Sequence, residues 1–134
     1  MKILLDTHMI LWAFTDSEQL SEKARRIIED RNNTIYYSVL SAWEVSIKHM
    51  LHPDRFILDA SEFCRLCTES GFIEVTLKNE HVRALETLKK KEHSKKHNDP
   101  FDRMLISQAK TENMTLLTHD KMARLYDEHC LKYV

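Results

Sequence analysis

The sequence is almost without glycine. Gly71 is the single glycine among 134 residues, where an average usage of about 7% would supply roughly nine. Phosphate-binding loops, dinucleotide-binding fingerprints and the G-x-S-x-G nucleophile elbow place several glycines where the backbone turns sharply or approaches a ligand. None of these motifs can be written in this sequence, which excludes the nucleotide-binding and hydrolase classes that depend on them.

The chain also has few cysteines, no long apolar run and no excess of one charge. Three cysteines are too few for a disulfide framework, and Cys64 and Cys67 in a predicted helix are best interpreted as small buried side chains. The first apolar run, 3–5, ends at Asp6 and is too short for a signal peptide or a membrane span. A formal net charge of -1 does not indicate a bulk polyanion binder. We expect a cytoplasmic protein with no membrane segment.

What the sequence does have is an alternation of apolar strands and amphipathic helices over one predicted domain, 1–134. Strands are predicted over 2–6, 34–38, 72–75, 115–118 and, at an edge, 131–134. Helices are predicted over 8–14, 21–31, 41–51, 59–71, 79–90, 99–112 and 121–126, with a capping box at Ser41 and Glu44. Strands separated by helices pair in parallel, which predicts an α/β sheet covered on both faces.

Five acidic residues fall where ligands bind in such sheets, at the carboxyl ends of the strands. Asp6 ends the first strand, Asp120 follows the fourth, and Glu44, Asp99 and Asp102 lie at helix starts. Carboxylates gathered in one pocket repel one another and have raised pKa values unless a cation neutralises them. Oxygen ligands favour Mg²⁺ or Mn²⁺ over zinc, and such an ion activates water and stabilises charge on a phosphoryl group.

Each acid apart from Asp6 also has an ordinary structural interpretation. Asp99 and Asp120 are natural helix N-caps. Glu44 lies four residues before Lys48, the spacing of an ion pair on one helix face. Asp6 is different, because an acid that closes an apolar strand has little evident structural reason to be there. Convergence of the five acids is therefore a hypothesis that spacing alone does not prove.

Four segments of the chain resemble the PIN-domain ribonucleases, specifically the VapC-like toxins of bacterial toxin–antitoxin pairs. In chain order they are Leu4-Leu5-Asp6-Thr7-His8, Ser41-Ala42-Trp43-Glu44 with Lys48, His97-Asn98-Asp99-Pro100-Phe101-Asp102-Arg103-Met104-Leu105-Ile106, and Thr118-His119-Asp120. The D-P-F-D-R stretch together with W-E is fairly specific to the family. One departure is Leu51-His52-Pro53, where the subgroup often has a glycine, so the turn there should differ.

The resemblance implies a three-layer α/β/α fold with a mainly parallel sheet. It also implies Mg²⁺- or Mn²⁺-dependent cleavage of RNA, a cognate antitoxin and a homodimer. The family's first, second and fourth acids match Asp6, Glu44 and Asp120, and the third matches Asp102, with Asp99 as the alternative. These four matches are the expected catalytic and metal-binding residues. The alternative function is a catalytically silent PIN-like module that binds RNA or another protein.

A basic segment precedes the D-P-F-D-R stretch. Residues 78–97 carry a net charge of +4, and Lys89, Lys90 and Lys91 within them suit either an RNA backbone track or a solvated loop. Arg103 suits either a phosphate ligand or a surface salt bridge.

Other side chains near the acids have two interpretations each. Trp43 is expected in the core or at a dimer contact rather than under a stacked base. Thr7 and Thr118 could orient water or phosphate, or bond local backbone. His97 and His119 are expected to be structural or peripheral, because metal-activated water needs no histidine base.

Overall fold

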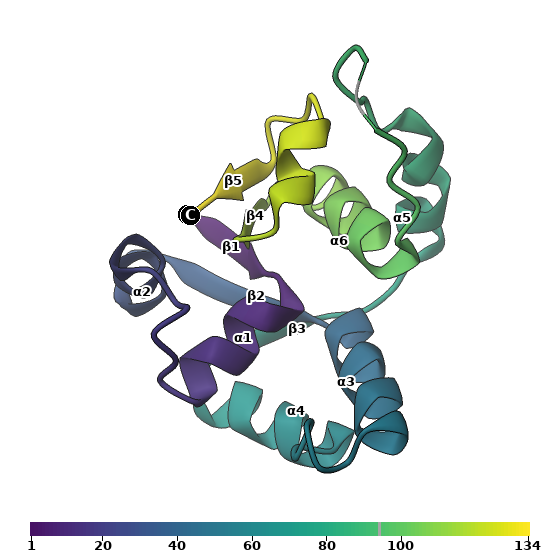
Figure 1. The fold of residues 1–134 in the computed structure, drawn as a ribbon. Helices are drawn as coiled ribbons and strands as arrows, with labels where there is room; N and C mark the ends of the chain where they lie inside the picture. Colours follow the sequence, from purple (N-terminus) through teal and green to yellow (C-terminus); the bar gives the residue numbers. More distant parts are fainter. Residues whose placement is uncertain (94) are drawn as a thin grey trace.

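Five short strands form one sheet in the order β3-β2-β1-β4-β5 in the computed structural model, which describes residues 1–93 and 95–134 (Figure 1). The strands are β1 (Lys2–Leu5), β2 (Thr34–Ser38), β3 (Ile73–Val75), β4 (Thr115–Thr118) and β5 (Leu131–Tyr133). All four neighbouring pairs are parallel, and Leu4 of the central strand aligns with Tyr36 on one side and Leu116 on the other. The predicted strands and the parallel sheet are confirmed, including the edge strand β5.

Helices cover both faces of this sheet (Figure 1). They are α1 (Thr7–Phe14), α2 (Glu22–Glu29), α3 (Val39–Leu51), α4 (Ala60–Glu69), α5 (Asn79–Ala84), α6 (Pro100–Thr111) and the short 3₁₀ helices η1 (Leu85–Thr87) and η2 (Lys121–Leu125). Ile3 and Leu5 of β1 pack into one core cluster with α1 and α4, whereas Leu4 packs into the other with α6. This alternation follows from the two-residue period of a strand, and it confirms the three-layer α/β/α fold.

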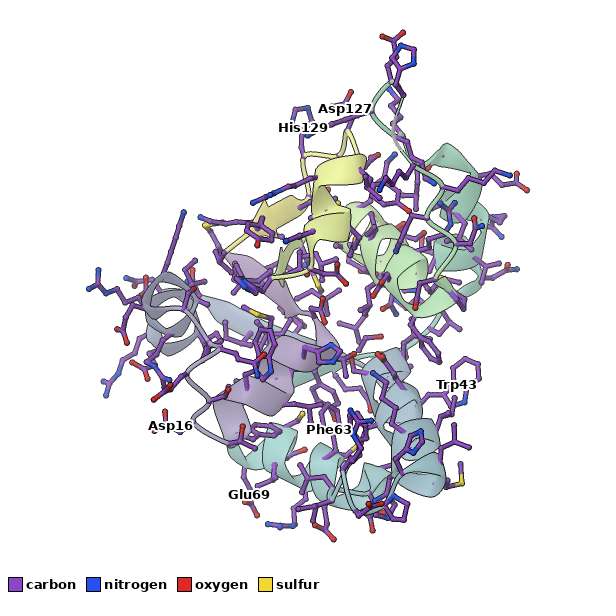
Figure 2. All side chains as sticks on the ribbon, in the orientation of Figure 1. Asp16, Trp43, Phe63, Glu69, Asp127 and His129 are labelled. Carbon is purple, nitrogen blue, oxygen red and sulfur yellow. The ribbon has the colours of Figure 1, made fainter. Side chains whose placement is uncertain are left out.

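The first core layer contains Phe63, the largest fully buried side chain among the described residues. Phe63 of α4 is fully buried, lies edge-on to Tyr37 and Phe14, and points into the molecule in Figure 2. Cys67 is buried in the same cluster and Cys64 packs against it, in agreement with the predicted packing role. Gly71 follows α4 with φ 79°, the left-handed conformation in which glycine commonly ends a helix.

The start of α3 differs from the predicted capping box. Ser38, not Ser41, is the N-cap, and its Oγ accepts a hydrogen bond from the Leu40 N–H at 3.0 Å. Ser41 is buried inside the helix, where its Oγ accepts the Thr7 hydroxyl at 2.8 Å. The prediction was wrong because the chain turns from β2 directly into the helix, so a strand residue supplies the cap.

The helix predicted over 79–90 is also shorter than expected. It ends as η1 at Thr87, and Lys90 then forms an antiparallel bridge with Tyr126. The Lys91 N–H donates to the Leu125 carbonyl at 2.9 Å. Tertiary hydrogen bonds thus replace the helical ones over the lysine run.

Among the described residues, no helix combines the length and the apolar character needed to cross a bilayer.

Candidate functional site

Asp6 lies where the central strand ends, and it has a structural role that the sequence did not reveal. It is only 6% exposed, and its Oδ1 accepts the His8 N–H at 3.0 Å as the N-cap of α1. Its Oδ2 accepts the Thr118 hydroxyl at 2.7 Å. The expectation that this acid lacks a structural reason was therefore wrong, because α1 begins directly after the strand and needs a cap.

Thr118 connects Asp6 to Asp120. Its hydroxyl donates to Asp6 and accepts the Asp120 N–H at 3.0 Å, while Asp120 Oδ1 accepts the Met122 N–H at 3.0 Å and caps η2. The bond from the Asp120 N–H matches the predicted role of bonding local backbone, whereas the bond to the Asp6 carboxylate was not predicted. One buried threonine fixes the positions of two acids that lie 114 residues apart in the sequence.

The first turn of α6 carries the next two acids. Asp99 is the N-cap, and its Oδ1 accepts the Asp102 N–H at 3.0 Å. Pro100 is the first helical residue, as predicted. Asp102 is one turn inside the helix, with Oδ2 lying 3.3 Å from His97 Nε2. A capping oxygen of Asp99 is occupied by backbone, which leaves the Asp102 carboxyl freer to meet a ligand.

The pKa of Asp102 depends strongly on burial and on the neighbouring carboxylates. Burial, which is the largest cause, and then the negative charges of Asp99, Asp6, Asp120 and Glu44, in that order, together raise the pKa of Asp102 to about 8. Burial also raises the pKa of Asp6, against the lowering effect of its hydrogen bonds from Thr118 and His8. The structure therefore brings the acids near enough to raise the cost of ionising Asp102.

Glu44 forms an ion pair along its helix and also adds its charge to the acidic group. Its Oε2 lies 3.0 Å from Lys48 Nζ, one helical turn on, and its side chain is 17% exposed. The predicted ion pair along α3 is therefore present. The charge of Glu44 nonetheless contributes to the raised pKa values of Asp102 and Asp6.

The acids lie farther apart than a closed ligand cage would require. Within residues 1–93 and 95–134, three or more candidate ligand atoms lie within 4.8 Å of one another only at Glu80, His81 and Glu112. Mg²⁺ usually keeps several waters and takes only one or two carboxylates. The spacing of the sheet-edge acids is thus compatible with a hydrated divalent ion rather than a dry cage.

The Glu112 cluster is explained by structure. His81 is fully buried, its Nδ1 accepts the Lys78 N–H at 3.0 Å, and its Nε2 lies 2.8 Å from Glu112 Oε1. The hydrogen bond from His81 lowers the pKa of Glu112, and the charge of Lys78 lowers it further. Both nitrogens of the ring are thus occupied, and the cluster joins α5 to the end of α6.

Two residues beside Asp102 have partners that the sequence did not predict. His97 Nδ1 lies 2.7 Å from the Tyr126 hydroxyl, and burial lowers the pKa of His97. Arg103 Nη1 donates to the Tyr126 hydroxyl at 3.1 Å, and Nη2 donates to the Leu85 carbonyl at 3.5 Å. Tyr126, which is buried, was missed entirely, because an isolated tyrosine at the end of a short helix gives no sequence signal.

The three consecutive lysines have different environments. Lys89 and Lys91 are exposed. Lys90 is partly buried, and its Nζ donates to the His97 carbonyl at 3.3 Å and lies 5.7 Å from the Tyr126 ring centroid. The basic segment is thus divided into two side chains free to meet solvent and one that packs beside the site.

Trp43 is not in the core. Its side chain points outward in Figure 2, is 58% exposed and lies edge-on to Phe101 with ring centroids 5.1 Å apart. The buried face of α3 is instead formed by Leu40, Ala42 and Val45 among others. The core expectation was therefore wrong, and the dimer contact stays a prediction.

His119 stacks on Tyr133 with centroids 5.2 Å apart, in agreement with a structural role.

A hollow beside the acids offers access to them. A cavity of about 580 Å³ is lined by Asp6 and Asp120 together with apolar side chains that include Trp12, Phe56 and Leu58. A ligand entering it can therefore reach two of the five acids while it contacts apolar side chains.

Comparison with known proteins agrees with this architecture. A family model described as the PIN domain matches residues 3–128. The solved structure of VapBC2 from Rickettsia felis, bound to a DNA fragment from their promoter, is similar with a TM-score of 0.69 and 17% identity, and the alignment covers 100% of this chain and 99% of that chain. At this identity the likeness is one of fold. A search of curated proteins finds no match. Because the family model spans nearly the whole described fold, the chain belongs to the PIN domain family.

Proposed function

We propose that this chain is a Mg²⁺- or Mn²⁺-dependent endoribonuclease that serves as the toxin of a toxin–antitoxin pair. Membership of the PIN family supports the nuclease class, and the similar fold of VapBC2 supports an antitoxin partner. One observation carries the proposal. At the carboxyl ends of β1 and β4, burial and the neighbouring carboxylates raise the pKa of Asp102 to about 8, and a bound cation would relieve that unfavourable charge.

The side chains fit such a cation. Asp6, Glu44, Asp102 and Asp120 would hold it, because they offer carboxylate oxygens alone and hard divalent ions prefer these ligands. Asp99 is the alternative third acid. Its Oδ1 caps α6, as the side chains of Asp6 and Asp120 cap α1 and η2, so the choice of Asp102 follows its match to the third acid of the family. When bound, the ion supplies an activated water and offsets negative charge on the phosphoryl group.

The remaining roles belong to the chain itself. Thr118 and the His8 N–H hold both oxygens of Asp6, so that carboxylate is oriented before any substrate arrives. Lys89 and Lys91 are exposed on the basic segment and would bind RNA phosphates. Arg103 would contribute less to RNA binding than its charge suggests, because two hydrogen bonds already hold it.

Purified protein should cleave single-stranded RNA in the presence of Mg²⁺ or Mn²⁺ and stop when EDTA is added. Asp6→Asn and Asp102→Asn should abolish this cleavage. Asp127→Asn is the matched control, since it removes the same charge from an exposed residue after η2 and should cleave normally. Cleavage that persists in EDTA or in both site variants would reject the proposal. RNA binding with no cleavage under any metal condition would favour the catalytically silent module.

The partner assignments need their own tests. As a toxin the chain would arrest growth when expressed alone in the cytoplasm, and co-expression of a small DNA-binding protein encoded beside it should restore growth. Sedimentation velocity should find a homodimer. No arrest in cells, despite RNA cleavage in the tube, would leave a nuclease without the toxin role.

A further inference from the structure

A chain of hydrogen bonds leads to Asp102 from the interior of the molecule. Arg103 Nη1 lies 3.1 Å from the Tyr126 hydroxyl, which lies 2.7 Å from His97 Nδ1, and His97 Nε2 lies 3.3 Å from Asp102 Oδ2. Tyr126 is only 2% exposed, and the backbone bridge with Lys90 fixes its position. Four side chains from three separate segments thus share one path.

When Asp102 is ionised, the chemistry of the four groups decides which atom donates and which accepts in each hydrogen bond of the path. A guanidinium can only donate, so the Tyr126 oxygen accepts from Arg103 and its own proton is available for His97 Nδ1. The neutral imidazole then carries its hydrogen on Nε2 and donates it to the Asp102 carboxylate. Each polar atom in the path has a partner of the right kind, which defines one tautomer of His97.

The path also holds the imidazole ring in place. Tyr126 lies edge-on to His97, with ring centroids 5.6 Å apart and planes at 90°. Lys90 Nζ donates to the His97 carbonyl at 3.3 Å. The ring is therefore fixed both by its hydrogen bonds and by packing, and its Nε2 points at one oxygen of Asp102. Within residues 1–93 and 95–134, no hydrogen bond reaches the other oxygen, which leaves it available for a ligand.

We propose that His97, Tyr126 and Arg103 are positioning residues that fix the orientation of Asp102 for a divalent cation. This inference rests on the proposed metal-dependent function. Hydrogen-bonded groups behind a metal ligand fix its orientation, and their loss typically weakens metal affinity or activity by about 10- to 100-fold. Of the two roles expected for His97, structural or peripheral, its contact with the Asp102 carboxylate favours the structural one.

The test measures Mn²⁺ binding by calorimetry without RNA. Tyr126→Phe keeps the ring and removes only the hydroxyl, so it should weaken binding by about 10-fold, and His97→Phe should weaken it at least as much. His97→Gln should recover part of the loss, because its amide can accept from Tyr126 and donate to Asp102. Tyr36→Phe is the matched control, since Tyr36 lies on β2 and forms none of the three hydrogen bonds of this path, and it should bind like wild type.

A second measurement does not depend on binding strength. Nitrogen-15 NMR of the Mg²⁺-loaded protein should find the His97 proton on Nε2. Equal Mn²⁺ affinity in wild type and Tyr126→Phe, or a proton on Nδ1, overturns the inference while the metal site stands. Wild-type protein that binds no Mn²⁺ overturns the proposed function as well, so the two failures are distinguishable. Circular dichroism of each variant shows whether it is folded.

Discussion

The two ends of α6 carry acidic residues whose pKa values shift in opposite directions. Burial and neighbouring carboxylates raise the pKa of Asp102, at the first turn, to about 8. The hydrogen bond from His81 lowers the pKa of Glu112, at the last turn. A helix dipole alone favours the reverse order, because it stabilises negative charge at the N-terminus and opposes it at the C-terminus. Local partners therefore decide both values.

The difference separates an acid that is bonded to cationic partners from an acid surrounded by like charges, and we propose the second as a metal ligand. Glu112 has cationic and hydrogen-bonding partners in His81 and Lys78. Asp102 is surrounded mainly by groups of its own sign, and His97 is its hydrogen-bonding partner. A dipole contributes about 0.3–1 kcal/mol at an exposed helix end, which burial and several like charges outweigh.

Replacing each of the two acids in turn should have the largest effect of the changes considered. Asp102→Asn should reduce metal-dependent RNA cleavage on the order of 100-fold or more, as loss of a group acting on transition-state charge does. Glu112→Ala should leave cleavage unchanged. It should instead lower the free energy of unfolding by about 1–3 kcal/mol, since the buried His81 N–H loses its acceptor. Cleavage rates and urea unfolding of both variants provide the check. A similar loss of cleavage in the two variants would remove the distinction.

The stability of the metal-free protein should depend on pH in opposite senses at the two ends. The raised pKa of Asp102 means that the folded state holds its proton more tightly than the unfolded state. Stability should therefore fall as pH rises from the unfolded value, 3.8, through about 8. The lowered pKa of Glu112 contributes stability that is present above 4.5 and is lost as pH falls through the folded value.

Melting temperatures of metal-free wild type and Asp102→Asn between about pH 5 and 9 isolate the contribution of Asp102. The variant should be as stable as wild type or more stable, and its advantage should grow toward high pH. Saturating Mn²⁺ should reduce that advantage, because the ion stabilises the ionised carboxylates. A difference that is constant with pH would contradict the raised pKa.

The two acids of the first turn of α6 should be separable by their effects on stability. Asp99→Ala removes the cap that accepts the Asp102 N–H and should cost about 0.5–2 kcal/mol of unfolding free energy. Asp99→Asn keeps a good capping group, so it should cost little and reduce cleavage only modestly. Thermal denaturation and cleavage assays test both variants. Cleavage lost with Asp99→Asn and kept with Asp102→Asn would exchange the roles of the two acids.

We expect RNA to bind near the Asp102 end of α6. Replacing the exposed lysines there should change RNA affinity, and this is the smallest of the expected effects. Replacing Lys89 and Lys91 with Gln should weaken RNA binding and reduce the salt dependence of the affinity by about 0.7 per lost phosphate contact. Lys23→Gln on α2 is the control, because Lys23 is also exposed but lies on another helix. An unchanged salt slope in the double variant would make the basic segment a solvated loop.

Local sequence patterns were sufficient for much of the fold. Apolar stretches such as 3–5 predicted β1, Asp99-Pro100 predicted the start of α6, and Gly71 predicted the end of α4. Each signal depends on residues close in the chain, through strand periodicity or a cap that bonds three residues on. The start of α3 was predicted wrongly because Ser38 serves both β2 and the helix.

The site was only partly predictable. The resemblance to PIN proteins selected Asp6, Glu44, Asp102 and Asp120, whose roles remain a proposal. Sequence alone did not predict the exposure of Trp43, because its helical spacing does not identify which face of α3 meets the sheet.

The sequence by itself determined the element types, their order, the Asp99 cap of α6 and the family of the fold. Only the tertiary structure decided which groups act on each carboxylate. Thr118 bonds Asp6 across 112 residues, and Tyr126 meets His97 across 29. The physical reason is that hydrogen-bond direction and charge repulsion depend on distances between atoms. Parallel strands and packed helices set those distances for residues that are remote in the chain.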